Sequence, residues 1–189
     1  PVADAVVSDG YNVTKTDNTG VYYLRTDFQK SGFVFLSLPS GYELDSKNPF
    51  PAFYESLSYS GKTIRKDFKL TRVDNTKHVL IATADMHISG VKRPKASAID
   101  TVLFKDGFLA DLDELKKSYP AGTKFYGVNI GDMVWEEYRE KNNVWYPEYK
   151  KVMRNVDFPV FHAIGNHDYD DRYENDDKIS EGEYNTYMG

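Results

Sequence analysis

Three short polar blocks, each directly after an apolar run of strand length, constrain this chain of 189 residues more than any other feature. The runs are His78–Ala84, Lys124–Ile130 and Phe158–Ile164. The blocks are Asp85-Met86-His87, Gly131-Asp132 and Gly165-Asn166-His167-Asp168. Continuous apolar runs of this length are typical of parallel strands covered on both faces. We therefore expect three buried parallel strands, each ending in a loop that carries polar side chains.

The segments between the runs have helical periodicity. Apolar residues recur at three-and-four spacing from Ile99 to Tyr119, interrupted at Gly107, and a shorter helix is predicted over Tyr146–Val156. Strand, helix, strand, helix, strand predicts a βαβαβ unit with parallel strands. In an open α/β sheet the loops at the carboxyl ends of neighbouring strands meet at one crevice. The three polar blocks should therefore lie side by side.

The first part of the chain has a different pattern and is predicted to be all-β. Short β-branched or aromatic runs are separated by turn residues and show no helical periodicity. The predicted strands are Ala5–Val7, Val13–Thr16, Val21–Arg25, Phe33–Ser37 and Ile64–Leu70. We expect a small antiparallel β-sandwich over residues 1–74 and an α/β domain over residues 75–189, with the boundary in the polar stretch Thr71–Lys77.

Composition excludes several classes of protein. The formal net charge is −5 with the basic residues scattered, so long nucleic acid is not an expected partner. Cysteine is absent, which excludes disulfide scaffolds, thiol nucleophiles and zinc-thiolate sites. No apolar run is long enough to predict a transmembrane segment.

Two carboxylates, two imidazoles and an amide oxygen of the blocks would face one another: those of Asp85, Asp132, His87, His167 and Asn166. Such a cluster is stabilised most simply by one or more divalent cations, and mixed oxygen and nitrogen donors suit Mn, Fe, Zn, Co or Ni. Taken singly, each block has an ordinary explanation: Asp85 as a helix cap, Asp132 as a turn residue, His87 as a surface imidazole. All three blocks in order favour a metal site.

This series of blocks resembles the calcineurin-like metallophosphoesterase superfamily over the second half of the chain. The resemblance implies a dinuclear centre with a bridging hydroxide, and it implies roles for five residues. Asp85 and His87 would bind the first metal, Asp132 would bridge both, and Asn166 would bind the second. His167 would be the catalytic imidazole near the leaving group, so that the catalytic set comprises His167, Asp85 and Asp132.

The second polar block departs from the pattern of one branch of the superfamily. The protein phosphatases of the superfamily have Gly-Asp-x-x-Asp-Arg-Gly at the second block, whereas this chain reads Gly131-Asp132-Met133-Val134-Trp135. The departure counts against a phosphoprotein phosphatase of that branch.

The first half also resembles the carboxypeptidase-regulatory-like sandwich that precedes such catalytic domains in secreted bacterial phosphoesterases. The resemblance rests on Val6-Val7-Ser8-Asp9-Gly10 and on the segment from Val13 to Tyr22. It implies a bacterial protein that is secreted or periplasmic.

The histidine count gives a further expectation. The superfamily pattern continues with a lone His and a final Gly-His-x-His, but the four histidines here are His78, His87, His162 and His167. His78 and His162 fall within strands and are expected to be structural. We therefore expect residues 1–189 to be part of a longer polypeptide, to lack strands and a covering layer, and to bind at most one metal with little or no hydrolysis.

The predicted function of the longer polypeptide is metal-dependent hydrolysis of a phosphomonoester or phosphodiester. The substrate is expected to be either a small molecule or a phosphorylated polymer. Two alternatives stay open: a surface binding or adhesion protein with an inactive phosphoesterase-like remnant, and a nucleotide pyrophosphatase or nuclease on the same scaffold. The acidic run from Asp168 to Asp177 is interpreted as a solvated loop.

Overall fold

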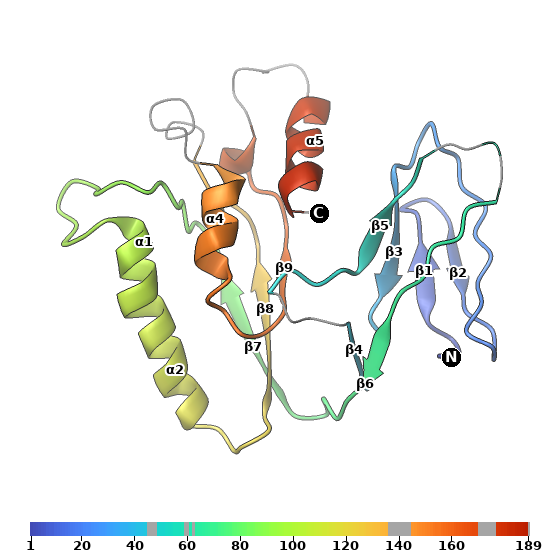
Figure 1. Ribbon diagram of the computed structural model, residues 1–189, viewed down its shortest axis with the longest axis horizontal. Helices are drawn as coiled ribbons and strands as arrows, with labels where there is room; N and C mark the ends of the chain where they lie inside the picture. Colours follow the sequence, from blue (N-terminus) through green and yellow to red (C-terminus); the bar gives the residue numbers. More distant parts are fainter. Residues whose placement is uncertain (45–48, 59–60, 62, 136–144, 170–176, 189) are drawn as a thin grey trace. The chain divides into compact units, whose positions relative to one another are not determined.

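The computed structural model describes residues 1–44, 49–58, 61, 63–135, 145–169 and 177–188. The chain forms two compact units, one of Pro1–Ser46 with Pro51–Thr76 and one of Lys47–Phe50 with Lys77–Gly189 (Figure 1). Each unit is described in turn.

The first unit contains a four-stranded antiparallel sheet and a two-stranded one (Figure 1). The larger sheet has the order β2-β1-β3-β5, with bounds Val6–Ser8 for β1, Val13–Lys15 for β2, Phe33–Ser37 for β3 and Tyr54–Ser56 for β5. The smaller sheet pairs β4 (Tyr42–Leu44) with β6 (Leu70–Arg72). The buried core of the unit consists of Ala5, Val7, Val34, Leu36 and Leu44.

Two predicted strands of this unit are wrong. Val21–Arg25 is not a strand, and of Ile64–Leu70 only Leu70 belongs to one, as the first residue of β6. Side chains do alternate in burial along both segments, which is the pattern that predicted strands. However, the two segments line the same open cavity, and the hydrogen bond that joins them runs from the Tyr22 hydroxyl to the Lys66 carbonyl, at 2.9 Å, rather than between backbones.

The second unit has the predicted order of strands and helices. The parallel sheet β7-β8-β9 consists of β7 (His78–Thr83), β8 (Lys124–Asn129) and β9 (Val160–His162). The helical elements are α1 (Asp100–Leu103), a π-helical turn over Phe104–Phe108, α2 (Leu109–Lys117), α4 (Tyr146–Met153), a 3₁₀ turn over Asn166–Asp168, and α5 (Asp177–Met188). The π-helical turn contains Gly107, where the periodicity is interrupted.

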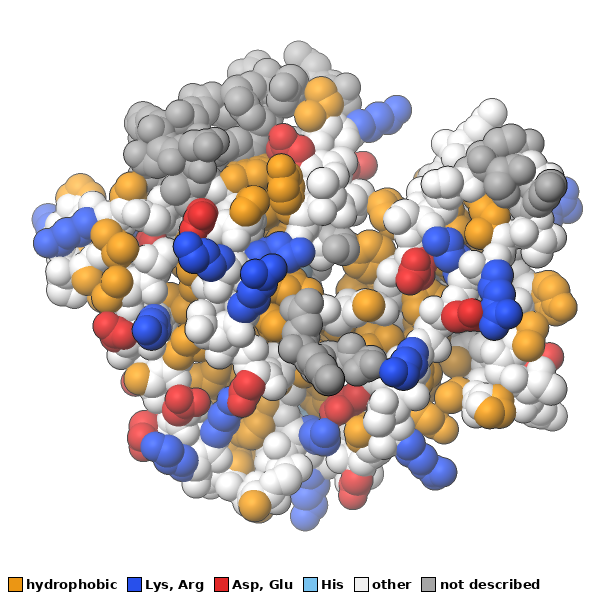
Figure 2. Space-filling view, viewed as in Figure 1, with side chains coloured by type: hydrophobic (Ala, Val, Ile, Leu, Met, Phe, Trp, Pro, Cys, Tyr) orange, Lys and Arg blue, Asp and Glu red, His pale blue; other side chains and the backbone are white. Residues whose placement is uncertain are grey.

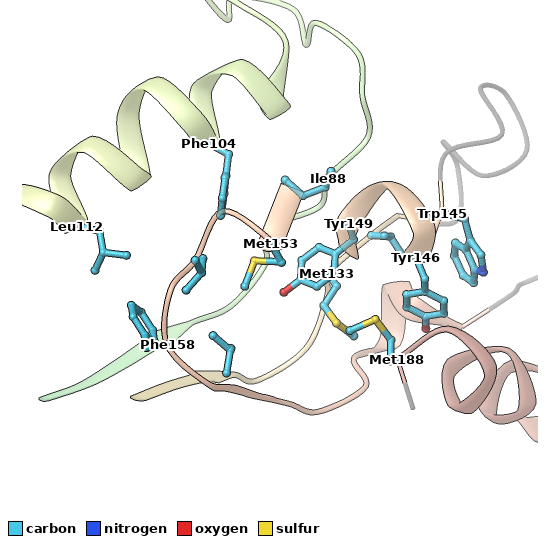
Figure 3. Close-up of a cluster of buried hydrophobic side chains, with 13 residues drawn as sticks. Ile88, Phe104, Leu112, Met133, Trp145, Tyr146, Tyr149, Met153, Phe158 and Met188 are labelled. Atoms are coloured by element: carbon cyan, nitrogen blue, oxygen red, sulfur yellow. The ribbon is translucent and has the colours of Figure 1, made fainter. Parts of the chain in front are cut away.

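One face of this sheet carries the core (Figure 3). Ile81, Phe125 and Val160 project from β7, β8 and β9 toward buried side chains of the helices. The helical side chains are Phe104 and Leu112 from the first helical segment, Tyr146, Tyr149 and Met153 from α4, and Met188 from α5. Tyr146 and Tyr149 have no exposed surface, so α4 is the helix that closes over the sheet near the ends of β8 and β9.

The other face of the sheet is open in the described part of the chain. Burial alternates along β7, and Leu80 is 61% exposed. Ile130, just after β8, is 63% exposed. In the described residues one face of the sheet is packed against helices, and the apolar runs therefore contain residues of a packed face and of an open one.

The acidic run after β9 also differs from its interpretation. Asp168 has no exposed surface, so it does not belong to a solvated loop. Residues 170–176 of the run lie outside the described residues. Helix α5, which sequence analysis missed, contributes Met188 to the core and a hydrogen bond from the Tyr184 hydroxyl to the His162 carbonyl. None of the helices in the described ranges is both long and apolar enough to cross a bilayer.

Candidate metal centre

The loops after β7 and β8 run together as a short ladder beyond the ends of their strands. Three backbone hydrogen bonds connect them: from Asp85 to Gly131 at 3.2 Å, from His87 to Asp132 at 2.9 Å, and from Ile88 to Met133 at 2.9 Å. The first two predicted polar blocks are therefore adjacent, as the parallel sheet requires.

A buried carboxylate connects the loop after β8 to the loop after β9. Asp168 accepts hydrogen bonds from the backbone N–H groups of Asp132 at 2.9 Å, Val134 at 3.0 Å and Gly165 at 2.8 Å. Burial raises the pKa of the Asp168 carboxyl, and these three donors oppose that increase. Its backbone N–H also donates to the Gly165 carbonyl at 3.2 Å. Asp168 stands three residues after Gly165, the spacing of the acidic residue in a capping box, which indicates the bond from the Gly165 N–H but not the two from the loop after β8.

Two glycines allow the same two loops to touch through their backbones. A Cβ on Gly131 would lie 2.7 Å from the Gly165 Cα, and a Cβ on Gly165 would lie 2.2 Å from the Asp132 Oδ1 atom. Gly131 also has φ = +114°, a conformation that side chains disfavour. Any side chain at Gly165 would displace Asp132.

Three of the predicted site residues have left-handed backbone conformations. The φ angles are +53° at Asp85, +46° at His87 and +57° at Asp132. Positive φ is uncommon outside glycine, and its clustering in the polar blocks is typical of functional sites, where surrounding contacts hold a strained backbone.

His87, Asp132 and His167 form a group that could hold a cation, with one potential ligand atom from each side chain within 4.8 Å of the others. The His87 Nε2 atom is buried, accepts or donates no hydrogen bond among the described residues, and lies 3.6 Å from the Asp132 Oδ2 atom. This distance is too long for a hydrogen bond, whereas ligands at ~2.0–2.1 Å from a tetrahedral zinc ion lie about 3.4 Å apart. The His167 backbone N–H donates to Asp132 Oδ1 at 3.0 Å, leaving Oδ2 toward His87. This donor set fits a divalent cation.

The structure places the other two predicted ligands differently. Asp85 is exposed and lies outside the group of three, although its backbone is joined to Gly131. Asn166 is exposed at the start of the 3₁₀ turn. Their roles as ligands, and the role of His167 as the catalytic imidazole, stay predictions.

Aromatic and cationic side chains surround the group. The Trp135 ring centroid lies 4.9 Å from that of His87 and 5.3 Å from that of His167, and the two imidazoles are 5.0 Å apart. Arg93 lies over the Trp135 ring at 5.6 Å and donates from Nη2 to the His87 carbonyl at 2.5 Å. Sequence analysis missed Arg93 because it belongs to none of the three blocks.

A polar layer lies beneath the site. The Asn129 Oδ1 atom accepts a hydrogen bond from the Gly131 N–H at 2.9 Å, and its amide group donates to the Tyr149 hydroxyl at 3.4 Å. That hydroxyl is 3.1 Å from His162 Nε2. Burial lowers the pKa of His162 to about 4 and raises that of Tyr149, so the imidazole is neutral near neutral pH. His162 lies within a strand, as predicted.

Comparison with known proteins agrees with this geometry. Residues 78–188 match the family model described as calcineurin-like phosphoesterase, and residues 1–73 match the one described as the N terminal of calcineurin-like phosphoesterase. The first match covers more than half of the chain, which therefore belongs to the calcineurin-like phosphoesterase family. No curated protein and no solved structure matches it. The likeness of the first half to a carboxypeptidase-regulatory-like module stays a prediction.

Proposed function

We propose that this protein hydrolyses a phosphomonoester or phosphodiester with the help of divalent metal ions held at the ends of β7, β8 and β9. The observation that carries the proposal is the pairing of a buried, unbonded His87 Nε2 with Asp132 Oδ2 at 3.6 Å, beside His167. Membership of the phosphoesterase family supports the reaction class.

The protein side chains would have separate tasks. Asp132 and His87 hold the cation, and the backbone N–H of His167 keeps the Asp132 carboxylate oriented toward His87. When bound, divalent cations lower the pKa of water and stabilise negative charge on phosphoryl oxygens. The His167 imidazole would give a proton to the departing oxygen, and its position beside His87, 5.0 Å between ring centroids, supports this role.

We propose that the centre takes two cations that share Asp132, with Asp85 and His87 on the first and Asn166 on the second. The first cation is expected to bind more tightly than the second. Support comes from the donor count: Asp85, His87 and Asp132 would give the first cation three protein ligands, whereas Asn166 adds only a neutral amide to the second.

The proposed substrate is a small phosphoester or a phosphorylated polymer. On the face shown in Figure 2, Lys and Arg side chains are interspersed with Asp and Glu and do not form one patch. This distribution, with a net charge of −5, supports a partner other than long nucleic acid. Export to the periplasm or beyond is a further proposal, supported by the resemblance of the first half to modules of secreted bacterial phosphoesterases.

The test is hydrolysis of p-nitrophenyl phosphate and bis(p-nitrophenyl) phosphate by the native protein, loaded with Mn²⁺ or Zn²⁺. Activity that is lost with chelator and in Asp132→Asn, but kept in the control Asp157→Asn on the exposed surface, supports the proposal. Failure to hydrolyse either ester while metal is bound would contradict it and favour a binding protein with an inactive remnant. Preferential cleavage of a nucleotide pyrophosphate in the same panel would instead assign the nucleotide pyrophosphatase.

A further inference from the structure

Arg93 is a cation at the edge of the metal centre that none of the assigned roles uses. It lies in the loop that follows β7, six residues after His87. Its guanidinium contacts two parts of the site: Nη2 donates to the His87 carbonyl at 2.5 Å, and the Cζ atom lies 5.6 Å from the Trp135 ring centroid. The Trp135 ring also contacts the rings of His87 and His167, so it links Arg93 to both imidazoles.

The guanidinium has hydrogen-bonding capacity to spare. Its Nε atom is buried and makes no hydrogen bond within the described part of the chain. No carboxylate of the described residues forms an ion pair with Arg93 either. A buried N–H donor without a partner is costly. Although Arg93 as a whole is only half-buried, its Nε–H group therefore calls for an acceptor from outside the described residues.

The chemistry of the neighbourhood selects the kind of anion. A planar guanidinium presents several N–H groups in a fixed fork that matches two oxygens of a phosphate, and it stacks on aromatic rings as it does here on Trp135. Next to Asp132 the chain carries Met133 and Val134, both fully buried, so that loop offers no basic side chain to the site at these positions. Arg93 provides the positive charge from the neighbouring loop.

We propose that Arg93 is a substrate-binding residue that holds two non-bridging oxygens of the phosphoryl group, with Trp135 keeping the guanidinium in place. The inference rests on the proposed function and deepens it. The rival interpretation is that Arg93 only supports the His87 loop through the bond to its carbonyl. In that case its loss would weaken metal binding rather than phosphate binding.

The experiment measures two affinities on the same preparations by isothermal titration calorimetry: Mn²⁺ for the metal-free protein, and inorganic phosphate for the Mn²⁺-loaded protein. Arg93→Gln is compared with Lys92→Gln, which removes one positive charge from an exposed neighbour in the same loop. Arg93→Gln is expected to weaken phosphate binding about 10- to 100-fold and leave the Mn²⁺ affinity within about twofold. Lys92→Gln should leave both affinities nearly unchanged.

Two further variants sharpen the result. Arg93→Lys keeps the charge but loses the fork, and should lie between Arg93→Gln and the parent in phosphate affinity. Trp135→Leu should weaken phosphate binding by a smaller factor, about threefold, because it removes the ring that holds the guanidinium but leaves Arg93 in place. The same ring contacts His87 and His167, so the Mn²⁺ affinity of this variant is measured as well. Unfolding midpoints of all variants show whether each is folded.

Three outcomes of these titrations would contradict the proposal, each in a different way. Phosphate binding by the parent protein that Arg93→Gln leaves unchanged would overturn the role of Arg93 and leave the proposed function standing. A parallel loss of Mn²⁺ and phosphate affinity in Arg93→Gln would also overturn it, in favour of support for the His87 loop. Absence of phosphate binding by the Mn²⁺-loaded parent would count against the proposed function itself and therefore against both.

Discussion

The two sides of the metal centre are built differently. On the β8 and β9 side, three contacts hold Asp132: Gly165 packs against it, the His167 N–H donates to its carboxylate, and the Asp168 carboxylate accepts from its N–H. On the β7 side, His87 is joined to the neighbouring loop, but the Asp85 side chain is exposed and outside the cluster.

The difference means that Asp132 is preorganised for a cation, whereas the Asp85 side chain would be recruited when the cation binds. Hydrogen bonds and close packing that exist before a ligand arrives need not be formed when it binds, so the β8 and β9 side is ready for a cation. The Asp85 side chain would have to be ordered on binding, at a cost in rotamer freedom. Substitutions of the residues that hold Asp132 in place should therefore affect folding, and substitution of Asp85 should affect metal affinity alone.

The largest effect is expected from Asp168→Ala, which breaks the β8 and β9 side directly. Three buried N–H groups would lose their acceptor, and we expect the free energy of unfolding to fall by about 3–5 kcal/mol in urea denaturation. Asp157→Ala, at a side chain that is 72% exposed, is the control and should change it by less than about 1 kcal/mol. An equally small loss in Asp168→Ala would show that the two loops are held by other contacts.

Gly165→Ala tests the glycine contact on the same side. The added methyl group would meet the Asp132 carboxylate and N–H, and we expect a loss of about 2–4 kcal/mol together with weaker metal binding. Gly182→Ala, in α5 with open space around the glycine, is the matched control and should raise stability by up to about 1 kcal/mol. If both variants behave alike, close packing at Gly165 is not what positions Asp132.

The polar layer beneath these loops predicts a dependence of stability on pH. The pKa of His162 is lowered to about 4 in the folded protein from its ordinary 6.5, so below pH 6.5 the unfolded state takes up a proton that the folded state does not. Stability is thus lost as the pH falls from 6.5 to 4. Relative to His162→Gln, the free energy of unfolding of the parent should decrease by about 2 kcal/mol more over this range. Parallel pH profiles of the two proteins would contradict the burial of a neutral imidazole.

Asp85→Asn should have the smallest effect of these substitutions. It tests the β7 side of the comparison. Because the side chain is exposed, the free energy of unfolding should stay within about 0.5 kcal/mol of the parent value. The Mn²⁺ affinity should fall about tenfold, as expected for a ligand that is recruited on binding. An unchanged affinity would remove Asp85 from the set of ligands.

Sequence patterns predicted the part of the molecule that depends on periodicity and topology. The apolar runs located β7, β8 and β9, and the rule that parallel strands end at one edge placed Asp85, Asp132 and Asn166 in adjacent loops. The Gly-Asp and Gly-Asn-His-Asp blocks identified the family, which the family model confirms.

The patterns failed where side chains far apart in sequence decide the outcome. Alternating burial in Val21–Arg25 resembled a strand, but a strand also needs a partner backbone, which alternation does not report. Leu80 and Ile130 are apolar yet exposed, because an apolar run does not say which face is packed. Sequence analysis assigned Asp168 to a solvated acidic loop. Its three N–H donors come from two different loops, and a sequence pattern does not show that these loops meet.

The most direct test of the account is calorimetric titration of residues 1–189 with Mn²⁺ and Zn²⁺, for the parent and for Asp132→Asn and His87→Ala. The account predicts one tight metal site in the unsubstituted protein. Each variant should lose at least about 100-fold in metal affinity while it remains folded. Two tight sites in the parent, or full affinity in Asp132→Asn, would contradict it.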